Sequence, residues 1–208
     1  MFTITSLMLF LGSAILLILV PGPDLLFAVT QGMTSGKRAG ILSAIGLSLG
    51  NIVHTLAAAL GVSIIIKTSA TVFTLFKIAG ACYLFYLAYK SFKHRKDPIG
   101  LREGSPESGR NLILKGFLMN VLNPKVAIFF LSFLPQFVND KQGHAGLQLF
   151  ILGMMFLILT GLIFGILGYF AGAFSQRLLS KSRFGEWMNI LGGCIFTIIG
   201  MKLVFTRL

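Results

Sequence analysis

Two short segments of this 208-residue sequence place proline beside a charged residue inside a long apolar stretch. The first is Pro21-Gly22-Pro23-Asp24, and the second is Asn123-Pro124-Lys125. Proline lacks the backbone donor that a helix needs, so a helix should be kinked or locally unwound at each segment. Such a break offers free carbonyls to an ammonium group and a positive helix end to a carboxylate. Both segments could therefore bind a small charged molecule.

Asp24 is the one acidic residue placed well inside an apolar stretch. The other five lie in polar breaks or at the ends of stretches: Asp97, Glu103, Glu107, Asp140 and Glu186. A charge inside a membrane is costly unless it faces a cavity or a partner, which makes a functional role the first interpretation. Lys125 holds the matching place in the second half of the chain. We predict that Asp24 and Lys125 face a shared polar cavity, where they could pair. Alternatively, Lys125 extends to the membrane interface.

Small and polar side chains recur at helical spacing in the second apolar stretch: Ser43, Gly46, Gly50, Asn51, His54 and Ala58. Gly46 and Gly50 should allow another helix to approach closely. Asn51 and His54 should then point into the bundle. There His54 could carry a proton near neutral pH or serve as a packing residue. Further neutral hydrogen-bonding groups are expected from Asn120, Asn123, Gln136 and Thr160.

The composition indicates that lipid surrounds the elements that carry these residues. The sequence is 55% hydrophobic and 12% charged, with a mean hydropathy of +0.87, whereas a soluble domain is roughly 25% charged. A membrane-spanning helix needs about 20 mostly apolar residues. Six stretches qualify: Leu7–Thr30, Gly40–Ile66, Thr71–Tyr89, Leu112–Phe137, Gly146–Phe174 and Gly185–Phe205. We therefore predict an all-α membrane protein with about six transmembrane helices.

The positive charge is distributed as membrane topology requires. A net charge of +12 would suggest nucleic acid as a partner of a soluble protein, but here the cations lie in short breaks between apolar stretches. If Lys37 and Arg38 lie in the cytoplasm, twelve of the 18 Lys and Arg residues are inside and four are outside. This bias follows the positive-inside rule and places both termini outside. We expect no nucleic-acid partner.

The chain divides into two similar halves. A polar linker over residues 91–111, rich in Gly and Pro, separates residues 1–90 from residues 112–208, with three apolar stretches in each half. Ile78–Cys82 resembles Ile190–Cys194, and a lysine follows each at the same spacing. An odd number of helices per half forces the halves into opposite orientations. Interrupted helices at equivalent places in inverted repeats indicate a transport site. We interpret Cys82 and Cys194 as small packing residues.

Several of these motifs resemble those of the lysine exporter (LysE/RhtB) family of bacterial amino acid efflux transporters. The first half carries Val20-Pro21-Gly22-Pro23-Asp24, followed by Gly36-Lys37-Arg38-Ala39-Gly40 and the helix of Gly46 and Gly50. The second carries Asn120, Asn123-Pro124-Lys125 and Phe133-Leu134-Pro135-Gln136-Phe137. The resemblance covers essentially the whole chain. It implies a bacterial inner-membrane protein that exports amino acids such as lysine, homoserine, threonine or leucine.

The function predicted from these observations is a secondary transporter that works by proton antiport and not an enzyme. Asp24 would bind the substrate amine, the antiported proton, or both in alternation. The predicted substrate and proton site comprises Pro21, Gly22, Pro23, Asp24, Asn51, His54, Asn120, Asn123, Pro124 and Lys125. We expect an amino acid and the lipid bilayer as partners, with a homo-oligomer possible, and no cofactor, catalytic residue or metal site. The alternatives are a divalent-metal exporter and a membrane-embedded lipid-modifying enzyme, for which buried ligands and nucleophile–base pairs are scarce.

Overall fold

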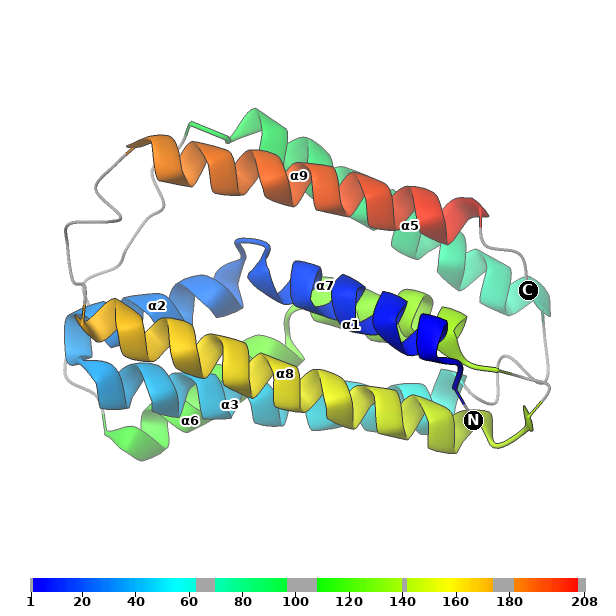
Figure 1. Ribbon diagram of the computed structural model, residues 1–208, viewed down its shortest axis with the longest axis horizontal. Helices are drawn as coiled ribbons and strands as arrows, with labels where there is room; N and C mark the ends of the chain where they lie inside the picture. The colour runs from blue at the N-terminus through cyan, green and yellow to red at the C-terminus, as the bar shows by residue number, and fades with distance from the viewer. Residues whose placement is uncertain (1, 63–69, 97–107, 140–141, 174–181, 206–208) are drawn as a thin grey trace.

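The computed structural model describes residues 2–62, 70–96, 108–139, 142–173 and 182–205, and all the regular elements within these ranges are helices. The helices run side by side along the long axis of the molecule (Figure 1). This confirms the predicted all-α class. The linker residues 97–107 lie outside the described ranges, and the prediction of halves at 1–90 and 112–208 stays a prediction.

The first apolar stretch forms two helices that meet at the proline-rich segment. Helix α1 covers Ile4–Leu19 and α2 covers Pro23–Ser35, with a bend of 59° between them. Val20 and Gly22 have extended backbones. Pro23 occupies the first turn of α2, where its missing N–H costs no helical hydrogen bond. The predicted break is confirmed at Pro21–Pro23.

The fourth apolar stretch is broken in the same way. Helix α6 covers Gly109–Val121 and α7 covers Pro124–Ile128. A π-helical turn, η2 (Phe129–Phe133), and a 3₁₀ turn, η3 (Leu134–Phe137), continue α7. The bend between α6 and the segment Pro124–Phe137 is 49°. Asn123 begins α7 because its side-chain oxygen accepts a hydrogen bond from the Lys125 backbone N–H, at 3.0 Å. The predicted break at Asn123-Pro124 is also confirmed.

The remaining helices are continuous. They are α3 (Lys37–Leu56), prolonged by the π-helical turn η1 (Ala57–Val62), α5 (Ala70–Lys93), α8 (Ala145–Ala173) and α9 (Ser182–Phe205). The predicted stretches match these bounds to within a few residues. The clearest differences are that α2 runs five residues past Thr30 to Ser35, and that α5 runs four residues past Tyr89 to Lys93, into the segment predicted as linker.

Within the described ranges, two helices are long and apolar enough to cross a membrane, namely Lys37–Gly61 and Ala145–Gly172. The two bent pairs bring the number to four if each pair is counted as one span. Helices α5 and α9 have 24 residues each, which makes each about 36 Å long. The prediction that they also span the bilayer rests on this length and on their parallel course. The start of α1 and the end of α9 lie at the same end of the molecule (Figure 1).

Glycine sets the closest helix packing. Helix α3 lies between α6 and α8, and α2 packs on α3 and α8. A Cβ atom at Gly40 would lie 2.6 Å from the carbonyl oxygen of Gly168, and one at Gly50 would lie 2.7 Å from the Asn120 side chain. A Cβ atom at Gly46 would meet the backbone of Ile113. The predicted close approach at Gly46 and Gly50 is confirmed, with α6 as the neighbour.

Helices α5 and α9 pack against each other and form a separate layer beside the other helices (Figure 1). In the predicted repeat, α5 corresponds to α9 and α3 to α8, and both of these pairs are in contact. This pairing supports the inverted repeat, which stays a prediction. Cys82 on α5 and Cys194 on α9 are exposed and free, so their interpretation as packing residues is wrong. Their side of each helix faces away from the bundle.

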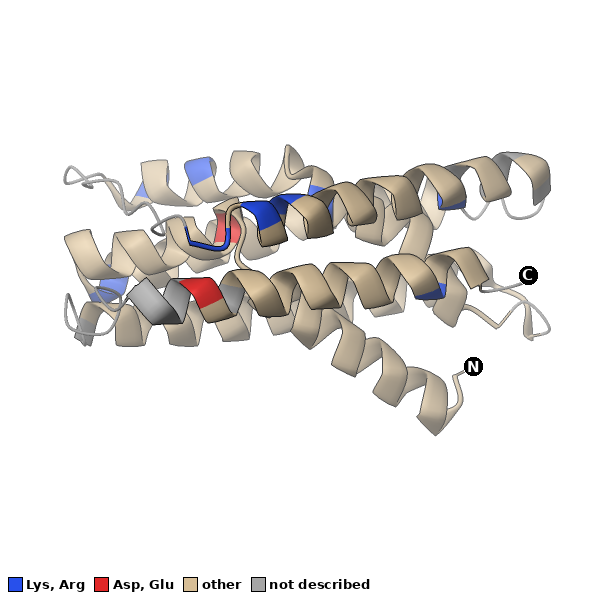
Figure 2. Cartoon of the chain, turned by 90° about the horizontal axis from the view of Figure 1, so that it is seen from above, with Lys and Arg blue, Asp and Glu red and all other residues tan. Residues whose placement is uncertain are grey.

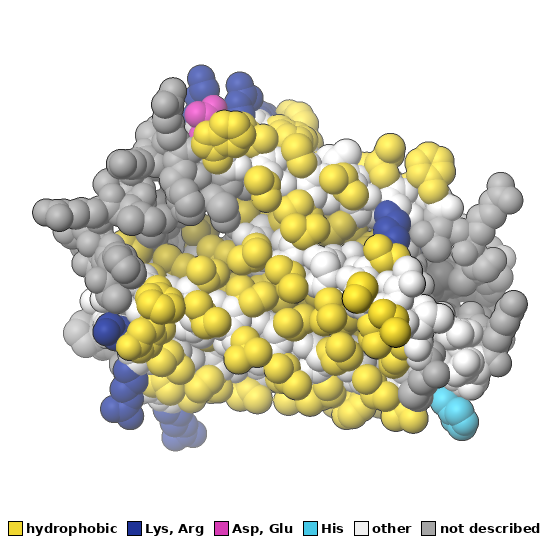
Figure 3. All heavy atoms as spheres, viewed as in Figure 1, with side chains coloured by type: hydrophobic (Ala, Val, Ile, Leu, Met, Phe, Trp, Pro, Cys, Tyr) yellow, Lys and Arg dark blue, Asp and Glu magenta, His cyan; other side chains and the backbone are white. Residues whose placement is uncertain are grey.

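The outer surface suits a lipid environment. Apolar side chains cover the middle of the face seen in Figure 3, and Lys and Arg side chains gather toward one end. Exposed large hydrophobic residues occur on every long helix, among them Leu16, Leu49, Leu75, Ile158 and Ile198. Figure 2 shows most Lys and Arg on the half of the molecule that holds the α2–α3 connection. These features establish a multi-pass membrane protein.

Candidate functional site

Asp24 is buried in the first turn of α2, with 1% of its surface exposed. Its Oδ2 atom accepts a hydrogen bond from Asn120 Nδ2 at 2.8 Å, and its Oδ1 atom has no partner. A carboxylate near a helix amino terminus is stabilised by the helix dipole. The break therefore positions an acid that keeps one oxygen available for a proton or a water molecule.

Lys125 is buried at the start of α7, with 6% of its surface exposed. Its Nζ atom donates hydrogen bonds to the carbonyl oxygens of Leu17 and Val20, both at 3.2 Å. Its amine points inward, so the alternative that Lys125 reaches the membrane interface is wrong. Its described hydrogen bonds go to the carbonyls at the end of α1, and no ion pair joins it to Asp24.

Asp24 and Lys125 do line one cavity, as predicted, but that cavity is very small. Its volume is about 10 Å³, which is room for roughly one water molecule. The lining residues are Leu17, Ile18, Asp24, Asn120, Lys125, Val126, Phe156, Thr160 and Phe164. The cavity can hold a proton carrier or a water molecule beside Asp24, and it is too small for an amino acid.

His54 and Asn51 both point into the bundle, as predicted. His54 Nε2 lies 3.0 Å from the backbone oxygen of Asn120, and the His54 ring contacts Phe130 with a centroid distance of 5.6 Å. Asn120 therefore connects Asp24 to His54. Asn51 is fully buried, and neither polar atom of its side chain has a partner. The structure brings His54 into the site through Asn120 but shows no hydrogen bond from the Asn51 side chain.

The two helix breaks also face a second, larger cavity, which we call the vestibule. Its volume is about 550 Å³, in the range of small-molecule sites. It is lined by Pro21, Gly22, Pro23, Leu26, Tyr83, Leu87, Lys90, Ser91, His94, Asn123, Pro124, Lys125, Asn189 and Phe196. The vestibule thus lies between the breaks and the layer of α5 and α9. Lys125 lines both cavities, whereas Asp24 lines only the smaller one.

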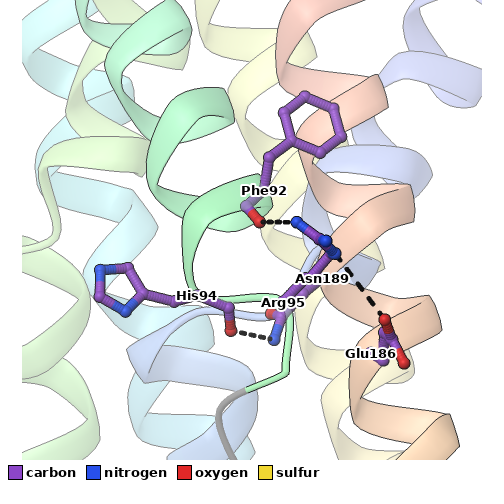
Figure 4. A network of polar contacts seen from close by, with 5 residues as sticks. All are labelled: Phe92, His94, Arg95, Glu186 and Asn189. Carbon is purple, nitrogen blue, oxygen red and sulfur yellow. Dashed lines mark hydrogen bonds and ion pairs between the residues drawn. The ribbon is translucent and has the colours of Figure 1, made fainter.

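Several vestibule residues were not predicted from the sequence: Leu26 of α2, Tyr83, Leu87, Lys90 and Ser91 of α5, His94 just beyond α5, and Asn189 and Phe196 of α9. Leu, Tyr and Phe do not stand out because they are equally common on lipid-facing surfaces, and Lys90, Ser91 and His94 lie in the polar break that follows the third apolar stretch. Polar contacts near His94 and Asn189 join the end of α5 to α9 (Figure 4). Asn189 donates a hydrogen bond to the His94 carbonyl at 3.4 Å, and Arg95 lies 3.8 Å from Glu186.

An aromatic cluster fills the other end of the interface between the layer of α5 and α9 and the rest of the bundle. Phe129, Phe133 and Phe137 stack along η2 and η3, and Phe129 also contacts Phe156 with a centroid distance of 4.9 Å. Lys202 of α9 lies 4.8 Å from the centre of the Phe137 ring. The layer of α5 and α9 is thus held against η2 and η3 at this end, whereas the vestibule separates it from the helix breaks at the other.

Comparisons with known proteins agree with these features. The family model described as LysE type translocator matches residues 15–207. The uncharacterised membrane protein YrhP of Bacillus subtilis is 30% identical over 95% of this chain and 97% of its own length. Leucine efflux proteins of Enterobacter sp. and Klebsiella pneumoniae are 28% and 27% identical over 97% of this chain and 96% of theirs. No solved structure matches the chain.

Proposed function

This chain belongs to the LysE type translocator family and is a transporter rather than an enzyme, and on that premise we propose that it exports amino acids from the bacterial cytoplasm. The leucine efflux proteins match it along nearly their whole length. Leucine and similar neutral amino acids are therefore the first substrates to test.

The observation that carries this proposal is the meeting of two broken helices at one cavity. Gly22 from the first break and Asn123 from the second both line the vestibule, with Lys125 between them. Interrupted helices that frame a binding site are a recurring feature of secondary transporters. The basic ends of α3, α5 and α6 would lie in the cytoplasm, with both termini outside. Lys90 and His94 at the end of α5 line the vestibule, which would therefore receive substrate from the cytoplasm.

We assign the antiported proton to Asp24. Its carboxylate lines the cavity of about 10 Å³ and not the vestibule, and its Oδ1 atom has no hydrogen-bond partner. A proton fits this space and an amino acid does not, which favours the proton over the substrate amine as the ligand of Asp24. His54 lies close by, bonded to the backbone oxygen of Asn120, whose side-chain amide bonds Asp24, and it is the second candidate for carrying the proton.

An export assay tests both parts of the proposal. Cells that express the protein are loaded with dipeptides, and each released amino acid is measured with and without a proton gradient. We expect Asp24→Asn to abolish uphill export. Asn can still accept the hydrogen bond from Asn120, so insertion and folding should be unchanged. Glu186→Gln, a partly exposed acid on α9, is the matched control and should export normally.

Two outcomes would contradict the proposal. Wild-type uphill export from Asp24→Asn would remove Asp24 from proton coupling. Failure of the wild-type protein to export any amino acid would reject the substrate class. Divalent cations belong in the same panel because they test the metal-exporter alternative. Among the described residues, no group of three His, Cys, Asp or Glu lies close enough to hold a metal ion.

A further inference from the structure

The charged side chains that line the vestibule, among the described residues, are basic. The ionisable side chains on its wall include Lys90, Lys125 and His94, and none of the described residues that line it is acidic. Asp24 lines the small cavity and not the vestibule. A positive cavity with apolar walls attracts an anionic group and repels a cationic one. The vestibule is therefore complementary to a carboxylate rather than to a cationic side chain.

Unused hydrogen-bond donors lie at the inner wall of the vestibule. Asn123 is 2% exposed, and its Nδ2 atom has no partner, whereas its oxygen accepts from the Lys125 backbone. An ammonium group carries three N–H donors, and Lys125 uses two of them on Leu17 and Val20. A carboxylate has two acceptor oxygens, one for the buried amide and one for the third ammonium donor.

Gly22 gives this wall its shape. A Cβ atom at this position would lie 3.2 Å from Lys125 Nζ, so glycine leaves the ammonium group approachable from the vestibule. Gly22 is also the residue that begins α2, and no side chain caps this helix end.

The rest of the wall is apolar. Leu26 of α2, Leu87 of α5 and Phe196 of α9 line the vestibule together with Tyr83 and the two prolines Pro23 and Pro124. Such a surface binds an aliphatic or aromatic side chain by removing apolar area from water. A lysine side chain would instead place its ammonium group in the same cavity as Lys90 and His94.

We propose that Asn123 and Lys125, beside Gly22, form the subsite for the substrate carboxylate, and that the vestibule selects neutral amino acids with apolar side chains. This assignment rests on the proposed export function and adds the residues and the substrate class. The assignment places the substrate and the antiported proton at different sites. The substrate binds in the vestibule, and Asp24 lines the small cavity.

The test uses inside-out membrane vesicles that contain the full-length protein, because their outer face presents the cytoplasmic side. Uptake of radiolabelled leucine is measured against an excess of leucine, leucinamide, 4-methylpentanoate or lysine. Leucinamide lacks the carboxylate, and 4-methylpentanoate lacks the amine. We expect leucine to compete fully, 4-methylpentanoate to compete in part, and leucinamide and lysine to compete at least tenfold less well than leucine.

Substitutions of Asn123 separate the role of its side-chain oxygen, which caps α7, from the role of its amide nitrogen. Asp and Ser both begin helices as well as Asn does, so Asn123→Asp and Asn123→Ser should keep the cap on α7. Both remove the amide donor, and only Asp adds a negative charge. We expect uptake to fall severalfold in Asn123→Ser and at least tenfold in Asn123→Asp. Asn111→Asp adds the same charge at an exposed position of α6 and should leave uptake unchanged.

Different results would contradict the carboxylate subsite and the export function. Equal competition by leucinamide and leucine, or wild-type uptake by Asn123→Asp in protein of wild-type thermal stability, would overturn the subsite while export itself stands. Lysine competing as well as leucine would overturn the proposed selectivity. Absence of uptake for every amino acid by the wild-type protein would reject the export function, and the subsite with it.

Discussion

At the residue scale, the two sequence motifs prove to be parts of one structure. In an unbroken helix the carbonyl of Leu17 would accept from the N–H of residue 21, but Pro21 has no N–H. Lys125 supplies the missing donor from the other half of the chain, and it also bonds the carbonyl of Val20. The break between α1 and α2 is therefore stabilised by Lys125, which follows the break between α6 and α7.

This arrangement predicts the effect of Lys125→Met. Methionine is similar in length but leaves the Leu17 and Val20 carbonyls without a donor, and an unsatisfied buried acceptor costs about 1–3 kcal/mol. Relief from burying the ammonium group offsets part of that cost. We expect a thermal midpoint lower by several degrees for the purified protein in detergent and a loss of leucine export.

Lys96→Met, at an exposed position beyond α5, is the control and should match the wild type in both measurements. A midpoint and an export rate for Lys125→Met that equal those of the control would show that the two hydrogen bonds do not hold the break.

Which residues mattered could be predicted largely from their chemistry, but their partners could not. Asp24 and Lys125 stand out because a charge is rare in an apolar stretch. Whether they pair depended on a detail the sequence does not contain, namely that the end of α1 lies closer to Lys125 than Asp24 does. Asn51 was placed inside by helical spacing, yet its two polar atoms have no partner among the described residues.

At the scale of elements, local rules predicted the helix breaks and tertiary packing decided the rest. Proline acts on its own turn, so the interruptions at Pro21–Pro23 and Asn123-Pro124 could be located within a residue or two. The π-helical turn at Phe129–Phe133 has no such local signal. The vestibule wall from α5 and α9 was missed for the same reason, since Tyr83 and Phe196 acquire their role only from where the layer packs.

The contact of α2 with α8 predicts a strong effect of Gly32→Ala. A Cβ atom at Gly32 would collide with the backbone carbonyl of Gly168, and backbone atoms cannot move aside as a flexible side chain can. Overpacking of this kind costs about 1–3 kcal/mol. We expect a lower thermal midpoint and a lower yield of folded protein in the membrane.

Gly165→Ala provides the matched control from the facing helix. A Cβ atom at Gly165 would have no heavy atom within 4 Å, so only the helix propensity changes, which favours Ala by about 1 kcal/mol. Gly165→Ala should therefore be neutral or slightly more stable than the wild type. Equal stability of the Gly32 and Gly165 variants would show that α2 and α8 are not in backbone contact.

At the scale of the whole molecule, the distribution of positive charge and the position of the vestibule together predict which side of the membrane the vestibule faces. Lys37, Arg38 and Arg110 lie at the starts of α3 and α6, and Lys90 and Lys93 lie at the end of α5. The vestibule is lined by Lys90 and His94 near that same end. The positive-inside rule then predicts that the cavity faces the cytoplasm.

Reporter fusions test this topology directly. A green fluorescent protein fused after Gly36 or after Gly104 should fluoresce, because both positions are predicted to be cytoplasmic, whereas fusion after Phe205 should be dark. Alkaline phosphatase, which is active only outside the cytoplasm, should give the opposite pattern at the same three positions. Agreement between the Gly36 and Gly104 fusions is the internal control, since an even number of crossings separates them. The reverse pattern would make the vestibule face outward, and the cavity would then be a release site rather than the site where the exporter takes up its substrate.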